Sequence, residues 1–181
     1  MLPDSAEIQA PPEPTAVAIA RAPRYWWATI GIIALDQISK GLVSAALGLY
    51  DSKNVIPGFL DLVHVRNEGV AFGLLNTTAL PYKTAITTLL AVTALAGIAL
   101  YARQLQQREW VARIGLACIL GGAIGNLIDR VRQGYVLDFV DVYWGTWHFW
   151  AFNVADAAIS IGAVLVFVDL LLVRSHASDS V

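Results

Sequence analysis

The sequence GGAIGNLIDRVRQGYVLDFVDVYWGTWHFWAFNVAD occupies residues 121–156 and connects two long apolar segments. Each of those segments has the length that a membrane-spanning helix needs. Four aspartates lie in this connection, directly beside the apolar segments. Ionisable groups in such positions are costly in a membrane protein unless they serve a site or face water. We therefore interpret residues 121–156 as the centre of a functional site.

The composition of the whole chain is that of an integral membrane protein. Of its 181 residues 57% are hydrophobic and 14% are charged, with a mean hydropathy of +0.60. A formal net charge of −2, without runs of Lys or Arg, disfavours nucleic acid as a partner. Cys118 is the only cysteine, and the three histidines lack the short spacings of a zinc site. We expect neither a metal nor another cofactor.

Four apolar segments predict a mostly α-helical fold with a bundle of four transmembrane helices. These segments cover about residues 25–50, 82–102, 110–128 and 153–173, and each holds the roughly 20 residues that a span requires. They form one membrane domain over residues 23–174, with a Pro-rich and acid-rich mobile tail at 1–22 and a polar tail at 175–181.

Two spacings within the predicted helices indicate specific contacts. Asp36 and Lys40 are four residues apart in the first helix, so they lie on one face and are expected to pair. Gly121 and Gly125 form a GxxxG pattern in the third helix, which suits close packing against a neighbouring helix.

Residues 51–79 differ from the helical segments. Short β-branched and alternating runs are interrupted there by Pro57, Gly58, Gly69 and Gly73. This pattern predicts a small β-element outside the membrane.

The distribution of basic residues orients the predicted bundle. Four crossings place both termini on one side, together with six arginines, which the positive-inside rule makes the cytoplasmic side. These are Arg21, Arg24, Arg103, Arg108, Arg113 and Arg174; five basic residues, Lys53, Arg66, Lys83, Arg130 and Arg132, lie toward the other side. The β-element and the polar stretch from Asp129 to Phe152 then share the outer face, where they can meet.

Polar side chains cluster at the outer ends of the third and fourth helices. Asn126 and Arg130 are four residues apart, and Gly122 continues the same face. Asn153 is placed to cap the fourth helix, with Asp156 three positions later in an arrangement close to a capping box. Structural readings also exist: Asn126 can tie helices together, and Arg130 can pair with Asp129 or Asp138.

The acids in this region suit acid–base hydrolysis. Two neighbouring carboxylates do not both ionise cheaply, so one keeps a proton while the other can deprotonate a water that attacks an amide carbonyl. Asp138 and Asp156 come from different elements and can converge, but Asp129 and Asp141 remain possible members of the pair on spacing alone. A Ser39–Lys40 pair is geometrically poor, because adjacent helical residues diverge by about 100°.

The segments GNLIDRVRQGYVLDF (125–139) and FNVADAAISIG (152–162) resemble the lipoprotein signal peptidases, the type II signal peptidases of bacterial membranes. Asp36, Lys40 and RNEGVAFG (66–73) support the resemblance, which covers about residues 25–173. It implies an aspartic endopeptidase of the bacterial inner membrane that cleaves signal peptides just before a cysteine carrying diacylglycerol. The implied enzyme is in contact with membrane lipid and has its active site near the periplasmic surface. Nothing in the sequence demands more than a monomer, so we expect a monomer.

The resemblance also implies roles for individual residues. Asp138 and Asp156 correspond to the catalytic aspartates, which makes Asp129 and Asp141 supporting candidates. Nine residues are implied to line or brace the site: Asp36, Lys40, Arg66, Asn67, Gly122, Asn126, Arg130, Asn153 and Ala155. Trp150 departs from the family, whose members commonly have proline there.

Two other classes of function fit the same residues. A small proton-coupled transporter could use Asp36, Lys40 and Asp156 as a relay through the bundle, and it would move charge without cleaving peptides. A structural membrane scaffold would use the charges only for caps and ion pairs, so their loss would reduce stability alone.

Overall fold

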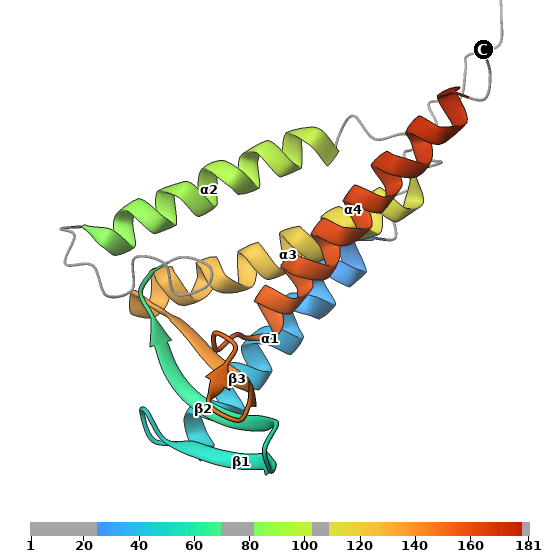
Figure 1. The fold of residues 1–181 in the computed structure, drawn as a ribbon. Coiled ribbons are helices and arrows are strands. Elements are labelled where there is room, and N and C mark those ends of the chain that lie inside the picture. The colour runs from blue at the N-terminus through green and yellow to red at the C-terminus, as the bar shows by residue number, and fades with distance from the viewer. Residues whose placement is uncertain (1–24, 70–81, 103–108, 179–181) are drawn as a thin grey trace, which may run out of the picture.

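The computed structural model of the protein describes residues 25–69, 82–102 and 109–178. These residues form four helices and a small antiparallel sheet at one end of them (Figure 1). The elements are α1 (Trp26–Ala46), β1 (Ser52–Ile56), β2 (Leu60–Asn67), α2 (Lys83–Ala102), α3 (Trp110–Gln133), β3 (Val136–Trp144), β4 (Trp147–His148) and α4 (Val154–Ser178). The predicted tail at 1–22 and the end of the predicted β-element, residues 70–79, lie outside the described residues.

Membrane-length apolar helices account for most of the described chain. Three are long and apolar enough to cross a membrane, at Thr84–Ala102, Trp110–Gln133 and Val154–Leu171. Helix α1 is also 21 residues long, but a polar run from Asp36 to Lys40 lowers its mean hydropathy. The prediction of a mostly helical membrane protein with a small β-element is therefore confirmed at this level.

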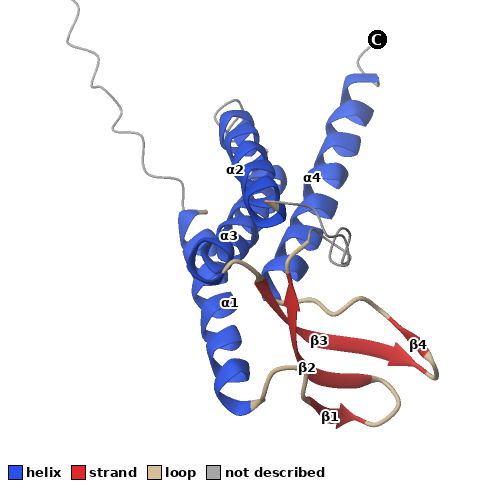
Figure 2. Ribbon diagram, turned by 90° about the vertical axis from the view of Figure 1, so that its left-hand side faces the viewer, coloured by secondary structure: helices blue, strands red, loops and turns tan. Residues whose placement is uncertain are grey.

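Helix α3 is the central element, with α1, α2 and α4 packed around it (Figure 2). Gly121 and Gly125 face α1: a Cβ at Gly121 would lie 2.9 Å from Cβ of Ile32, and one at Gly125 would lie 2.6 Å from Oδ2 of Asp36. The close packing predicted from the GxxxG pattern is confirmed. On the side facing α4, a Cβ at Gly122 would overlap the carbonyl oxygen of Ala155.

The sheet combines two segments that are far apart in the sequence. Its strand order is β1-β2-β3-β4, and β2 pairs antiparallel with β3 through partners such as Val65↔Asp138 and Asn67↔Val136. The predicted meeting of the β-element with the polar stretch after the third helix is thus confirmed. The polar stretch itself contains two strands, β3 and β4, which its sequence pattern does not predict.

Helix α3 ends five residues later than predicted, at Gln133 instead of Ile128. Gly134 adopts the left-handed conformation with φ of 82° and caps the helix. Asp129 and Arg130 are therefore helical, as the shared face predicted for Asn126 and Arg130 requires, and the first residues of the predicted polar stretch belong to α3. The physical reason is that the Asp129 carboxylate has partners on α1 and β3, so it is buried at 5% exposure without breaking the helix.

A compact apolar cluster holds the sheet against the helix ends. Val43 of α1 packs with Leu137 and Phe139 of β3, and all three side chains are buried. Val154, at the start of α4, packs against the same cluster. The strand that carries Asp138 is therefore fixed to α1 and α4 by hydrophobic contacts on both sides of that residue.

Replacing Gly115 by alanine should destabilise the protein. A Cβ at this position in α3 would lie 2.7 Å from the carbonyl oxygen of Gly162 in α4. Overpacking of this kind costs about 1–3 kcal/mol. Gly97→Ala in α2 is the matched control, because a Cβ there meets nothing within 4 Å. Thermal unfolding in detergent should show a lower midpoint for Gly115→Ala alone; equal midpoints would contradict the close α3–α4 contact.

Candidate active site

Asp138 and Asp156 meet where β3 reaches the first turn of α4. Asn153, immediately before α4, contacts both: its Nδ2 donates to Asp138 Oδ1 at 2.7 Å, and its backbone N–H donates to Asp156 Oδ2 at 3.3 Å. The Asp156 backbone N–H donates in return to Asn153 Oδ1 at 3.0 Å. The predicted capping box is confirmed, and the same asparagine bridges the two acids.

Each aspartate accepts a further hydrogen bond from an asparagine on another element. Asn67 of β2 donates through Nδ2 to Asp138 Oδ2 at 3.0 Å, and Asn126 of α3 donates through Nδ2 to Asp156 Oδ1 at 2.8 Å. All four carboxylate oxygens therefore have an N–H donor. The pair is positioned from β2, α3, β3 and α4 together, which restricts how either carboxylate can rotate.

The environment of Asp138 favours its protonated form. The pKa of this carboxyl is raised from 3.8 to about 7, chiefly because burial disfavours the charged form and also because the charge of Asp156 lies nearby. The hydrogen bonds from Asn67 and Asn153 and the charge of Lys40 oppose these effects. Near neutral pH a substantial fraction of Asp138 therefore holds a proton that it can donate.

Lys40 connects α1 to this pair. Its Nζ lies 2.8 Å from Asp36 Oδ2, so the pairing predicted from their spacing is confirmed. The same Nζ donates to Asn126 Oδ1 at 2.9 Å. Since the lysine occupies the amide oxygen, Nδ2 of Asn126 is directed to Asp156. Lys40 is thus linked to Asp156 through a single amide group.

The remaining predicted site residues have different surroundings. Arg130 donates through Nη2 to the carbonyl oxygen of Gly69 at 3.0 Å and through Nη1 to that of Asn126 at 3.4 Å, while its buried Nε has no partner among the described residues. Arg66 lies over the Tyr135 ring, 4.5 Å from its centroid. Ala155 is fully buried, and its N–H donates to Asp36 Oδ1 at 3.0 Å.

The other two acids that the sequence left open lie in separate networks. Asp141 bonds Nδ1 of His148 at 2.9 Å, on the exposed side of the β3–β4 hairpin. Asp129 lies between α1 and α3, where Lys40 and Gln37 contact it. Sequence reasoning missed Gln37: it is a neutral residue beside Asp36, and no spacing signal predicts that its side chain reaches α3.

Two neighbouring carboxylates, one buried and one partly buried, lie at the end of a bundle of membrane-length helices, an arrangement that suits an integral membrane enzyme of the acid–base hydrolase class. Residues 28–172 match the signal peptidase II family, and the chain belongs to that family. It is accordingly a bacterial integral membrane protease. Nothing in the comparisons supports a transporter.

Individual relatives agree with this assignment over nearly their whole length. The lipoprotein signal peptidase of Solibacter usitatus is 43% identical over 148 residues, which are 82% of this chain and 90% of that protein. The lipoprotein signal peptidase of Geobacter sulfurreducens is 44% identical over 142 residues, or 78% and 88%. A solved bacterial membrane enzyme superposes with a TM-score of 0.74 at 28% identity, covering 84% of this chain and 90% of that one.

The stability of the protein should fall as the pH rises from about 4 to about 7. Over this interval Asp138 is ionised in the unfolded chain, where its pKa is near 3.8, but keeps its proton in the fold, where burial raises the pKa to about 7. Asp138→Asn should remove much of this fall, because an amide does not titrate. Unfolding midpoints in detergent across this range provide the measurement. An unchanged slope in Asp138→Asn would refute the assignment.

Proposed function

We propose that the protein cleaves the signal peptide of lipoprotein precursors just before a cysteine that carries diacylglycerol, with Asp138 and Asp156 as the catalytic pair. The observation that carries the proposal is the Asn153 bridge, which holds the two carboxylates together at the helix ends. The substrate class follows from the relatives, which are lipoprotein signal peptidases. The partners would be lipid-modified precursors and membrane lipid, and the protein would act as a monomer.

The proposed reaction assigns a distinct task to each aspartate. Asp138, with a pKa raised to about 7, supplies the proton, while Asp156 in its ionised form accepts hydrogen bonds from Asn126 and Asn153. Asp156 takes a proton from water as the oxygen attacks the carbonyl carbon. Asp138 then gives its proton to the leaving nitrogen as the C–N bond breaks. Transfer of a proton from Asp156 to Asp138 restores the starting state.

Groups around the pair are suited to hold an extended peptide. Arg130 has a buried Nε–H without a partner among the described residues, and we assign it to a substrate carbonyl. Asn67 and Arg66 lie at the end of β2, where an extended peptide can be held beside Asp138. Gly122 permits the close approach of α3 to α4 beneath the pair.

We further propose that α1 is a fourth transmembrane helix. Its 21 residues give a length of about 31 Å at roughly 1.5 Å per residue. Its buried charges, Asp36 and Lys40, face the other helices, whereas its large exposed side chains include six apolar ones: Trp26, Trp27, Ile30, Leu35, Ile38 and Leu42. Four spans and the positive-inside rule put both termini in the cytoplasm. The sheet and the aspartate pair then lie near the periplasmic surface.

Incubation of the purified protein with a diacylglyceryl-modified precursor and with its unmodified counterpart tests the proposed reaction. Selective cleavage of the lipidated form, measured by product size, is the expected result. Asp138→Asn and Asp156→Asn should each reduce the cleavage rate at least about 100-fold, because general acid–base catalysis contributes at least that much. Asp141→Asn is the matched control on the same strand. Full activity in either variant of the pair would rule out its assignment, and charge movement without cleavage would favour a transporter.

The proposed orientation is tested with single cysteines in a Cys118→Ala background. Ser52→Cys on exposed β1 should react with a membrane-impermeant maleimide on intact spheroplasts, because the sheet is placed in the periplasm. Trp110→Cys, at the exposed start of α3, should react only after permeabilisation. The reverse labelling pattern would show that the sheet faces the cytoplasm, and it would refute the proposed orientation.

A further inference from the structure

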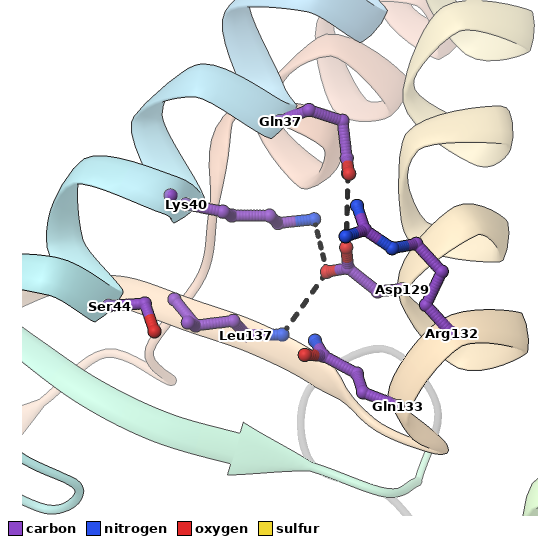
Figure 3. Close-up of a pocket in the computed structure, with 8 residues that line it drawn as sticks. Gln37, Lys40, Ser44, Asp129, Arg132, Gln133 and Leu137 are labelled. Atoms are coloured by element: carbon purple, nitrogen blue, oxygen red, sulfur yellow. Dashed lines mark hydrogen bonds and ion pairs between the residues drawn. The ribbon is translucent and has the colours of Figure 1, made fainter.

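Two buried carboxylates face each other across the contact between α1 and α3. Asp36 is fully buried, and Asp129 is 5% exposed. Nζ of Lys40 lies 2.8 Å from Oδ2 of each carboxylate, so one ammonium group bridges them. Nε2 of Gln37 makes a second bridge, at 3.1 Å from Asp36 Oδ2 and 3.0 Å from Asp129 Oδ1. Figure 3 shows Lys40 and Gln37 reaching from α1 to the Asp129 carboxylate on α3.

Each of these carboxylates also holds the backbone immediately before one member of the aspartate pair. Asp36 Oδ1 accepts the N–H of Ala155 at 3.0 Å, and Ala155 precedes Asp156. Asp129 Oδ2 accepts the N–H of Leu137 at 3.3 Å, and Leu137 precedes Asp138 (Figure 3). We call these two contacts anchors: in each, a carboxylate oxygen accepts the backbone N–H of the residue before an aspartate of the pair. The Asp36 anchor holds the start of α4, and the Asp129 anchor holds β3.

A third connection from the same lysine reaches a side chain of the pair. Lys40 Nζ donates to Asn126 Oδ1 at 2.9 Å, and Asn126 donates to Asp156. The lysine therefore uses its three N–H donors on Asp36, Asp129 and Asn126. A buried ammonium ion with every donor satisfied is held in place, because losing any one partner leaves an uncompensated group in a low-dielectric site.

From these contacts we infer that Asp36, Lys40 and Asp129, with Gln37, form a clamp that sets the separation of Asp138 and Asp156. The inference rests on the proposed function of that pair. Asp129 and Gln37 act as positioning residues, since their contacts are with the clamp and the backbone and not with either catalytic carboxylate. Acid–base catalysis depends on positions held within about 0.5 Å, so loosening one anchor should slow the chemical step more than it weakens substrate binding.

The clamp has polar space beside it. A cavity of about 280 Å³ is lined by Gln37, Lys40, Gly41, Ser44, Asp129, Arg132, Gln133 and Leu137 (Figure 3). If a substitution at Gln37 or Asp129 removes a hydrogen-bonding group, water in this cavity can take its place. The helices then need not move closer together to fill the space. This makes the clamp accessible to mutation without the overpacking that substitution of the α3 glycines would cause.

Asp129→Asn and Gln37→Leu test the clamp against a purely structural role, with Asp141→Asn as control. Asp129→Asn keeps an oxygen for the Leu137 N–H but loses the ion pair to Lys40. It should lower kcat about tenfold or more with KM within about twofold, because the clamp positions the catalytic pair and does not touch the substrate. Gln37→Leu leaves all three charges in place and should lower kcat by a smaller factor.

Hydrogen exchange at two amides provides a readout that is independent of activity. Asp129→Asn should speed exchange of the Leu137 N–H more than that of the Ala155 N–H, because a neutral amide oxygen accepts a weaker hydrogen bond than a carboxylate. Asp36→Asn should have the opposite preference. Wild-type kcat in both Asp129→Asn and Gln37→Leu, or exchange that changes equally at the two amides, would overturn the clamp. If the wild-type protein itself cleaves no lipidated precursor, the proposed function fails, while the exchange measurement still decides whether the anchors act separately.

Discussion

The bridge that the Lys40 ammonium makes between Asp36 and Asp129 is the interaction on which the rest of the site depends. A lysine that is 4% exposed inside a helix bundle is tolerable only because carboxylates and an amide surround it. Those same carboxylates accept the N–H groups before Asp138 and Asp156. The carboxylates that compensate the Lys40 charge are therefore the same groups that hold the backbone beside Asp138 and Asp156. This single arrangement connects α1, α3, β3 and α4.

Such an arrangement requires helices that approach closely, and the glycines of α3 permit this. Gly121 and Gly125 bring α3 against α1, while Gly122 and Gly115 bring it against α4. A methyl group at Gly125 would occupy the space of the Asp36 carboxylate. Because glycine has no side chain, the α3 backbone lies close to α1 and α4. The short polar side chains of the site can therefore reach one another across these contacts. The apolar packing and the polar network thus depend on the same small residues.

Several features of the site were predictable because they are local in sequence. The Asp36–Lys40 pair follows from helical spacing, and the Asn153–Asp156 cap follows from the pattern at a helix start. The strands β3 and β4 were not predicted, because this polar stretch forms strands only through its partners: β3 pairs with β2, and β4 pairs with β3. The late end of α3 was missed for a related reason: the partners that bury Asp129 come from α1 and β3.

The sequence by itself determined a membrane protein built from apolar helices, the faces on which its charged residues lie, and, through its motifs, membership of the signal peptidase II family. Spacing alone could not rank four aspartates, since spacing along a chain does not measure separation in space. Only the tertiary structure decided that Asn153 joins Asp138 to Asp156, that Asp141 pairs with His148, and that Asp129 faces Lys40. The physical reason is that the environment of a carboxyl, its burial and its N–H donors, is assembled from elements distant in sequence.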